Sequence, residues 1–228
     1  LVREGDDRFR FAHKSFLEFF MAKGLLAGLE RSPEQVLDTA RLTPEVAAFV
    51  AELLRVRGNG VDDPAITALQ RWLVAGREAR LEGSARAAAN ALRLLRDLAR
   101  EFEQRAGWVP ERADLRMLAF DGEELGGLRL HGARFERARM IGVEFGDADL
   151  GGASIQDADL RDARFRGARL DDVVFERTDL SGVEAHGCSL RGASFRKVEM
   201  RQATWTGCDW QDAAIEDLVV GPTILTNI

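Results

Sequence analysis

Residues 148–167 read ADLGG ASIQD ADLRD ARFRG, four blocks of five in which alanine opens each block and a larger apolar residue stands third. This spacing holds from Ala113 to Ile215. Two inward residues in every five match neither the period of a helix, roughly 3.6, nor that of a flat strand. The pattern therefore predicts a stacked solenoid in which each unit packs only on its neighbours. The apolar centres are Leu115, Phe120, Leu125, Leu130, Phe135, Met140, Phe145, Leu150, Ile155, Leu160, Phe165, Leu170, Phe175, Leu180, Ala185, Leu190, Phe195, Met200, Trp205, Trp210 and Ile215.

The position two residues before each centre forms a second, smaller subsite. From Ala133 to Ala213 it holds only Ala, Val, Thr or Cys. Earlier in the chain Glu123 occupies this subsite, so the pattern is weaker over 113–132. Cys188 and Cys208 both fall in the subsite, twenty residues apart.

Blocks such as 148–152, 158–162 and 163–167 resemble the A(D/N)LXX consensus of the pentapeptide-repeat family. The resemblance implies a right-handed, four-sided β-helix with one pentapeptide on each side. Residues twenty apart would then stack, and a strand spacing of about 4.8 Å gives about five coils in a rod on the order of 25 Å long. We therefore predict an α+β multidomain chain, an N-terminal α-helical region followed by a right-handed quadrilateral β-helix.

The stacked centres form the predicted interior of this rod. Phe145, Phe165, Ala185 and Trp205 would share one column, in which the large Trp205 compensates for the small Ala185. A rod filled in this way leaves no cofactor cavity. The predicted repeat core comprises Phe135, Met140, Phe145, Leu150, Ile155, Leu160, Phe165, Leu170, Phe175, Leu180, Leu190, Phe195, Met200, Trp205, Trp210 and Ile215.

The stacking brings the two cysteines close enough for a disulfide. The chain shows no secretory signal, and a reduced pair of small core residues is the simpler expectation in a cytoplasmic protein. Whether Cys188 and Cys208 pair stays open at this point.

Charge is distributed in alternation along the predicted rod. The chain carries a net charge of −6, and the acidic excess lies in the repeat region. Stacked outward positions alternate in sign, as in Glu144, Arg164 and Glu184, whereas Asp159, Asp179 and Glu199 keep one sign. Opposite charges on neighbouring coils favour cross-strand pairing.

The family resemblance also implies an alternative function. Some stand-alone pentapeptide-repeat proteins resemble DNA and occupy the DNA site of type II topoisomerases. Such mimicry needs a continuous negative strip, which arginines such as Arg164 and Arg166 interrupt. Direct nucleic-acid binding is not expected, because the rod has no basic face interleaved with aromatic residues.

The N-terminal half carries helix signals instead. Ser32-Pro33, Thr43-Pro44 and Asp63-Pro64 each place an N-cap residue before a proline, and Gly83-Ser84 precedes a further apolar stripe. We predict four helices between about 33 and 105, with Trp108-Val109-Pro110 as the joint to the rod. Such helices would cover the first coil, whose apolar cross-section is otherwise bare.

Residues 8–22 carry a second resemblance. Residues 8–12 alternate like a short strand, and from Ser15 the apolar spacing becomes helical. The stretch resembles F-x-F-x-H-x-S-F-x-E-F-F-x-A in the winged-helix domain of NACHT-type signal-transduction NTPases, through Phe9, Phe11, His13, Ser15, Phe16, Glu18, Phe19, Phe20 and Ala22. The resemblance implies that His13 contacts a nucleotide phosphate in the parent protein. A histidine that ends a strand and bonds a backbone carbonyl is the alternative, and both stay open.

The domains predicted on this basis are a winged-helix remnant over 1–30, a helical bridging domain over 31–110 and the β-helix over 111–228. The chain has no G-x-x-x-x-G-K-[ST] loop, so the module that binds ATP or ADP would precede Leu1. No cofactor, metal or catalytic residue is expected within the chain itself. Its other histidines, His131 and His186, fall on separate parts of the rod.

The predicted function is that of a non-catalytic sensor and interaction region in a cytoplasmic signalling NTPase. A protein partner is expected on the rod, and the resemblance also implies self-assembly and bacterial defence. The far end suggests a homodimer or higher assembly, because Val220 and Leu225 continue the apolar period but no capping helix follows. A stand-alone DNA mimic and a passive protein-binding scaffold are the alternatives. No membrane contact is expected, and the ligand is not indicated by the sequence.

Overall fold

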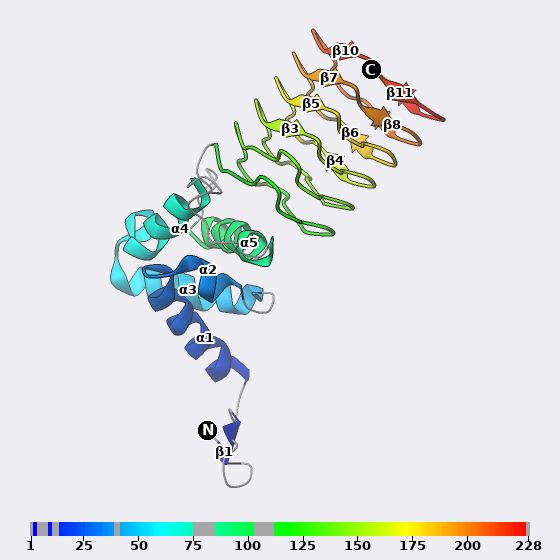
Figure 1. Ribbon diagram of the computed structural model, residues 1–228. Coiled ribbons are helices and arrows are strands. Elements are labelled where there is room, and N and C mark those ends of the chain that lie inside the picture. Colours follow the sequence, from blue (N-terminus) through cyan, green and yellow to red (C-terminus); the bar gives the residue numbers. More distant parts are fainter. Residues whose placement is uncertain are drawn as a thin grey trace.

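The chain consists of a helical region followed by a rod of stacked coils, with the N-terminus and the C-terminus at opposite ends (Figure 1). This arrangement comes from a computed structural model that describes residues 2–3, 9–10, 14–38, 42–74, 85–102 and 112–226. It matches the predicted order of an α-helical region before a β-solenoid. His13 and the predicted joint 108–110 lie outside the described residues.

The helical region begins with a short antiparallel pair, β1 (Val2–Arg3) and β2 (Phe9–Arg10), followed by α1 (Lys14–Leu29). The four later helices begin at the predicted signals. They are α2 (Pro33–Leu37), α3 (Pro44–Arg57), α4 (Pro64–Val74) and α5 (Ala85–Glu101), with the 3-10 turn η1 (Gly60–Asp62) before α4.

The caps explain why these helices start where the sequence predicts. The Val46 backbone N–H donates to Thr43 Oγ1 (3.4 Å) at the start of α3, and Gly58, with φ 76°, ends it. The buried Asp63 accepts from the Ala65 N–H (3.0 Å) at the start of α4. The predicted set of four helices is therefore confirmed.

The rod turns a corner at every fifth residue. From Arg112 to Asp217 each such residue has a left-handed φ between 50° and 72°. Glycine adopts this conformation freely, whereas each non-glycine residue there, such as Arg137 or Asp157, costs roughly 1–2 kcal/mol. The five-residue period of the sequence is thus a period of the backbone, with one side of the coil between successive corners.

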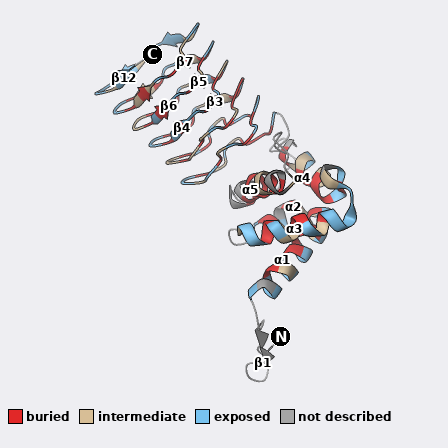
Figure 2. Ribbon diagram, turned by 180° about the vertical axis from the view of Figure 1, so that it is seen from behind, coloured by how far each residue is buried: buried red, intermediate tan, exposed pale blue. Residues whose placement is uncertain are grey.

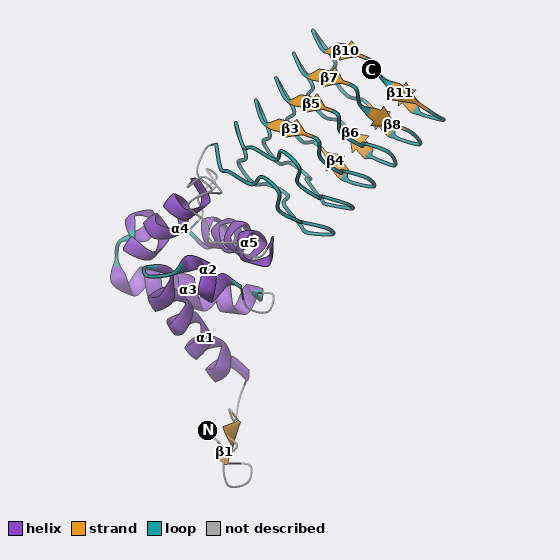
Figure 3. Ribbon diagram, in the orientation of Figure 1, coloured by secondary structure: helices purple, strands orange, loops and turns teal. Residues whose placement is uncertain are grey.

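Neighbouring coils pair in parallel with a shift of twenty residues (Figure 3). Ile155 lies beside Phe175, which lies beside Phe195 and then Ile215. One four-stranded sheet holds β3 (Ser154–Gln156), β5 (Val174–Glu176), β7 (Ser194–Arg196) and β10 (Ala214–Glu216); another holds β4 (Arg164–Arg166), β6 (Glu184–His186), β9 (Thr204–Thr206) and β12 (Ile224–Thr226); β8 (Glu199–Met200) pairs with β11 (Val219–Val220).

Regular strands cover four layers, one fewer than the about five coils expected. Isolated parallel bridges continue the same ladder from Ser154 back through Arg134 to Asp114. The difference lies in where three-residue strands form, because the stacking itself extends further.

The centres of the repeat are buried in the rod, and Figure 2 draws buried residues in red. The rings of Phe145 and Phe165 stack with centroids 5.1 Å apart, and those of Phe175 and Phe195 lie 5.0 Å apart. Ala185 lies in register with the fully buried Trp205, as the column predicts.

The last coil corrects the predicted core. Every centre of the predicted repeat core from Phe135 to Trp205 is at most 2% exposed, but Trp210 is only partly buried and Ile215 is 52% exposed. Both belong to the end of the stack, where no described coil lies beyond them. Their side chains keep the repeat spacing and lack the covering layer.

The buried position of Leu180 gives a direct test of the repeat frame. Leu180→Asp would place an unpaired carboxylate in the core and should destabilise the rod by more than about 4 kcal/mol. Ser181→Asp puts the same group at the next, partly exposed position, on the outward column between Arg161 and Arg201, and should stay within about 0.5 kcal/mol. Thermal melting followed by circular dichroism compares the two, and equal melting temperatures would rule out this frame.

Candidate interaction surfaces

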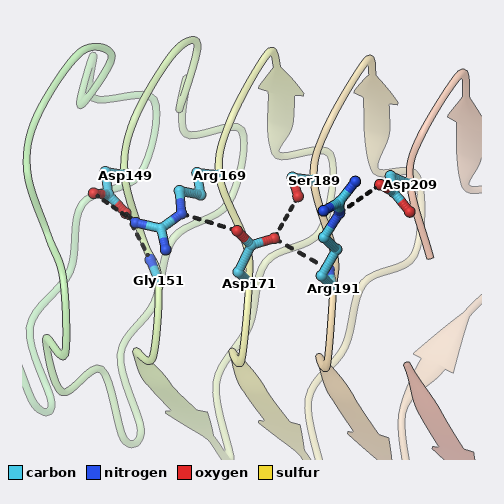
Figure 4. A network of polar contacts seen from close by, with 7 residues as sticks. All are labelled: Asp149, Gly151, Arg169, Asp171, Ser189, Arg191 and Asp209. Carbon is cyan, nitrogen blue, oxygen red and sulfur yellow. Dashed lines mark hydrogen bonds and ion pairs between the residues drawn. The ribbon is translucent and has the colours of Figure 1, made fainter. Parts of the chain in front are cut away.

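One long face of the rod is covered by a continuous network of charges (Figure 4). Arg169 lies between two carboxylates, with Nη1 3.3 Å from Asp149 Oδ2 and Nε 2.9 Å from Asp171 Oδ2. Asp171 also accepts from the Ser189 hydroxyl and from the Arg191 backbone N–H (3.1 Å). Acidic and basic side chains therefore follow one another along this network. The predicted alternating column is confirmed on another face, where Arg164 lies 2.6 Å from Glu144 and 3.2 Å from Glu184.

The network holds its carboxylates in the charged form. Partial burial opposes the effect, but hydrogen bonds from Ser189 and Arg169 lower the pKa of Asp171. The Gln211 backbone N–H and the Arg191 guanidinium, whose Nε lies 2.6 Å from Asp209, lower the pKa of Asp209. Exposed pairs of this kind contribute little each, about 0–1 kcal/mol. This face satisfies its charges internally and offers few of them to a ligand.

The acidic column of Asp159, Asp179 and Glu199 is also neutralised, by arginines that lie next to it. Arg161 Nη2 lies 2.7 Å from Asp159 Oδ2 and its Nε lies 3.8 Å from Asp179 Oδ2. Arg201 approaches Glu199 at 3.7 Å. The acids of this column do not form the uninterrupted negative strip that replacing DNA phosphates would need.

The helical region covers the first coil, as predicted. The centres Leu115, Phe120, Leu125 and Leu130 are at most 1% exposed, although no coil precedes them among the described residues. The Asp114 N–H donates to the carbonyl of Leu73 in α4 (3.0 Å), and Arg96 of α5 donates to the carbonyl of Glu124 (2.7 Å). The backbone edge of this coil is thus bonded to two helices.

A buried polar contact explains why Glu123 breaks the small-residue rule. Its carboxylate pairs with the guanidinium of Arg93 in α5, which is 5% exposed. Arg93 also donates to Asn90 Oδ1 (3.1 Å), and the same oxygen accepts from the Leu42 N–H (3.3 Å). Asn90 in turn donates to the Leu37 carbonyl (2.8 Å). The repeat departs from its consensus where it meets the helices.

The far end of the rod is bare. Ile215, Val220, Ile224 and Leu225 are 47–58% exposed. Ile215, Val220 and Leu225 continue the interior columns, whereas Ile224 follows the outward Thr204. A depression of about 140 Å³ lies among Met200, Trp210, Ala213, Ile215, Leu218 and Leu225. A contiguous apolar patch of this kind marks an interaction site more often than a solvated surface.

The two cysteines are both free and buried, one coil apart. Cys188 Sγ donates to the Phe165 carbonyl at 3.0 Å. The hydrogen bond shared with Cys208, together with burial, raises the pKa of Cys188. The same contact lowers the pKa of Cys208. A neutral, buried thiol is a poor nucleophile, so Cys188 is part of the packing.

The sequence singled out three histidines, and the structure does not bring them together. His131 and His186 lie exposed on different sides of the rod, and His13 is outside the described residues. Across the described ranges there is no cluster of three His, Cys, Asp or Glu side chains suited to a metal ion. No helix in the described part of the chain has the length and hydrophobicity needed to span a bilayer.

The sequence analysis missed the partner of Glu123. The signal was present as Arg93, an arginine among the apolar residues Ala91, Leu92 and Leu95 on the buried side of α5. A cation within an apolar stripe requires a partner, but spacing alone does not say which carboxylate supplies it.

Four-sided coils, parallel pairing at twenty residues and a left-handed corner at every fifth position define a β-solenoid. The family described as pentapeptide repeat region matches residues 128–205, so this segment is a pentapeptide repeat. The match begins after Glu123, the residue that departs from the small-residue subsite. A comparison with curated proteins gave no match.

Solved structures of pentapeptide-repeat proteins are similar to about half of this chain. Rfr23 from the cyanobacterium Cyanothece 51142 is 12% identical over 50% of this chain and 88% of its own, with a TM-score of 0.40. HetL from the cyanobacterium Nostoc sp. strain PCC 7120, involved in heterocyst differentiation regulation, is 24% identical over 50% and 60%, with a TM-score of 0.23. QnrB1, a plasmid-mediated fluoroquinolone resistance protein, is 15% identical over 49% and 82%, with a TM-score of 0.25. These low TM-scores carry no argument about function.

The Arg93–Glu123 pair predicts an unusual response to a consensus substitution. Glu123→Ala restores the small residue that the repeat prefers, yet it should destabilise the chain by about 3 kcal/mol, because Arg93 is left buried without a counter-charge. Glu124→Ala, at a 67% exposed neighbour, is the control and should stay within about 0.5 kcal/mol. The double variant Arg93→Leu/Glu123→Ala should recover most of the loss. A Glu123→Ala variant that melts like wild type would contradict the role of this pair.

Proposed function

We infer that this chain is the non-catalytic C-terminal sensor and interaction region of a NACHT-type signal-transduction NTPase, with the pentapeptide-repeat rod as its binding arm. The observation that carries the interaction role is the difference between the two ends of the rod. Helices cover the first coil, whereas Ile215, Val220 and Leu225 leave an apolar surface at the last one. The interior is filled by its own side chains, which favours binding over catalysis.

The bare end suits a second copy of the same chain. Its outer strands β10, β11 and β12 pair on one side only with the preceding coil, so backbone groups remain for pairing on the other side. Two such ends related by a two-fold axis present the same strands and the same apolar side chains to each other. The long faces of the rod, whose charges pair with one another, would then remain accessible to the sensed partner.

The NTPase part of the proposal draws support from α1. Strand β2 precedes this helix, in the order that the winged-helix resemblance implies. Phe16, Leu17, Phe20 and Met21 on its N-terminal half are 43–59% exposed. A helix with four large apolar side chains in solvent is expected where a further domain packs against it.

The proposed mechanism is a two-state switch. Partner binding on the rod would bias the closed and open arrangements of the NTPase module, which would hold ATP or ADP and lie in the cytoplasm. The connection through Glu123, Arg93 and Asn90 supports this, because it bonds the first coil to the end of α2 and to Leu42 before α3. Movement of the rod would thus be transmitted to the helices rather than absorbed by a loose joint.

Two alternatives are consistent with the repeat fold. A DNA mimic directed at a type II topoisomerase is favoured less, because Arg161 and Arg201 neutralise the acidic column. A passive protein scaffold would share the bare end but would need neither the exposed face of α1 nor the buried connection to the helices. A P-loop encoded upstream of Leu1 in the same reading frame would favour the signalling NTPase over both.

Assembly through the bare end is tested with a pair of valines. Val220→Lys should abolish association, because it places a charge in the apolar end, whereas Val174→Lys, at a 37% exposed valine on the side of the rod, should leave it intact. Light scattering at tens of micromolar measures both. A monomeric wild-type chain, or equal association of the two variants, would remove this interface.

Substitution of His13 tests whether this residue contacts the nucleotide in the parent protein. His13→Leu removes a donor at similar volume, so the closed state should lose a contact worth about 1.5 to 3 kcal/mol and basal signalling should rise. The melting temperature of the isolated 228-residue chain should not fall, because that chain has no nucleotide to contact. A destabilised chain without a gain of signalling would return His13 to a structural role at a strand end.

A further inference from the structure

A groove lies where α5 meets the side of the rod. Its volume is about 500 Å³, and its lining includes Arg96 from α5 and, from the rod, Glu124, Gly126, Gly146, Arg166 and His186. The groove lies on the face formed by β4, β6 and β9, away from both the bare end and the charged face of Figure 4. Its size falls within the range of small-ligand and peptide sites.

The floor of the groove is bare backbone. The outward position that follows each centre on this face reads Gly126, Gly146, Arg166 and His186 on successive coils. Two successive coils therefore carry no side chain at this position. On the next two coils, the side chains of Arg166 and His186 form a wall of the groove. The carboxylate of Glu124 and the side chain of Arg96 close the end nearest the helices.

Gly146 is required neither by its backbone nor by its neighbours. Its φ lies outside the left-handed region, and an added Cβ would meet nothing nearer than the Arg166 carbonyl oxygen, at 3.8 Å. Gly126 differs, because a Cβ there would come within 2.9 Å of the Gly146 carbonyl oxygen. A glycine with room for a side chain marks a place where another chain or ligand approaches the backbone closely.

Most charged side chains around the groove already form ion pairs or hydrogen bonds within the chain. Arg164 is held by Glu144 (2.6 Å) and Glu184 (3.2 Å), and Arg96 by Asp97 (2.9 Å) and the Glu124 carbonyl. Two charges are engaged least: Glu124, whose only ion pair among the described residues is the long one to Arg96, and Arg166. The Glu124 carboxylate is 67% exposed, with its nearest cation 3.9 Å away, and the exposed Arg166 has no ion pair recorded among the described residues.

These two charges define the ligand. Glu124 and Arg166 stand two coils apart, about 10 Å, with the glycine floor between them. We propose that the groove binds an extended peptide segment of a protein partner that carries a basic and an acidic side chain two residues apart. The basic side chain pairs with Glu124, the acidic one pairs with Arg166 and accepts from the His186 imidazole, and the peptide backbone lies over Gly126 and Gly146.

The dimensions agree with such a segment. Side chains two residues apart in an extended chain lie about 7 Å apart on one face, and long side chains cover the remaining distance to Glu124 and Arg166. A free anion would use Arg166 and His186 but leave Glu124 without a partner. The site is separate from the bare end, so it goes beyond the proposed assembly and does not depend on it.

Fluorescence polarisation with short labelled peptides of Gly and Ser tests the proposal. One peptide carries a lysine and a glutamate two positions apart; the comparison peptides carry two lysines or two glutamates. The lysine–glutamate peptide should bind the 228-residue chain tightest. Gly146→Leu, which fills the floor, should weaken its binding at least about tenfold, and Thr206→Leu, in the same column but outside the groove, should not.

Arg166→Glu supplies a variant at an exposed position that leaves the core untouched. It should transfer preference from the lysine–glutamate peptide to the two-lysine peptide. Val220→Lys, which tests the bare end, should bind the peptides like wild type, so the two proposals fail independently. Equal binding of all three peptides, tighter binding of the two-glutamate peptide, or competition by inorganic phosphate that Gly146→Leu leaves unchanged would overturn the proposal.

Discussion

The left-handed corner at every fifth residue is the constraint on which the rest of this molecule depends. It fixes the length of each side, and four sides bring residue i directly beneath residue i + 20. Ladder hydrogen bonds, aromatic stacking and charge pairing all follow from that one shift. The corner also has a cost, because residues such as Arg137 and Asp157 adopt a conformation that suits glycine better. The stack is stable because each coil recovers this cost through buried centres and ladder bonds.

Features repeated along the chain could be predicted from the sequence, and features made by two unlike elements could not. Leu180 repeats its environment at Leu160, so spacing alone identifies both as buried. Thr43 acts on its own backbone, so the start of α3 could be predicted from the sequence as well. Ile215 keeps the spacing but has no described coil beyond it, and a periodic pattern does not say where the stack stops being covered.

The contacts between α5 and the rod escaped prediction for a related reason. Glu123 was visible as an exception, but its meaning depended on Arg93, thirty residues earlier and on a helix whose placement no local rule gives. The groove escaped in the same way, since Gly126 and Gly146 become a floor only when Arg96 stands beside them. Glu123 departs from the repeat, and Gly126 and Gly146 stand at outward positions that the repeat leaves unrestricted. Regular positions build the rod, and the remaining ones carry its contacts with other elements.

Because of the shift of twenty residues, the length of the rod and the orientation of its far end can change separately. Adding a block of twenty residues would lengthen the stack by one coil, about 4.8 Å, and leave every face oriented as before. Adding a block of five would keep the interior pattern intact but rotate everything beyond the insertion by about a quarter turn relative to α5. The bare end could thus be moved farther out or turned to a new azimuth, although a block of five also changes which centres stack on one another. A solenoid of this kind is an adjustable spacer whose length and heading are set by how many blocks it contains.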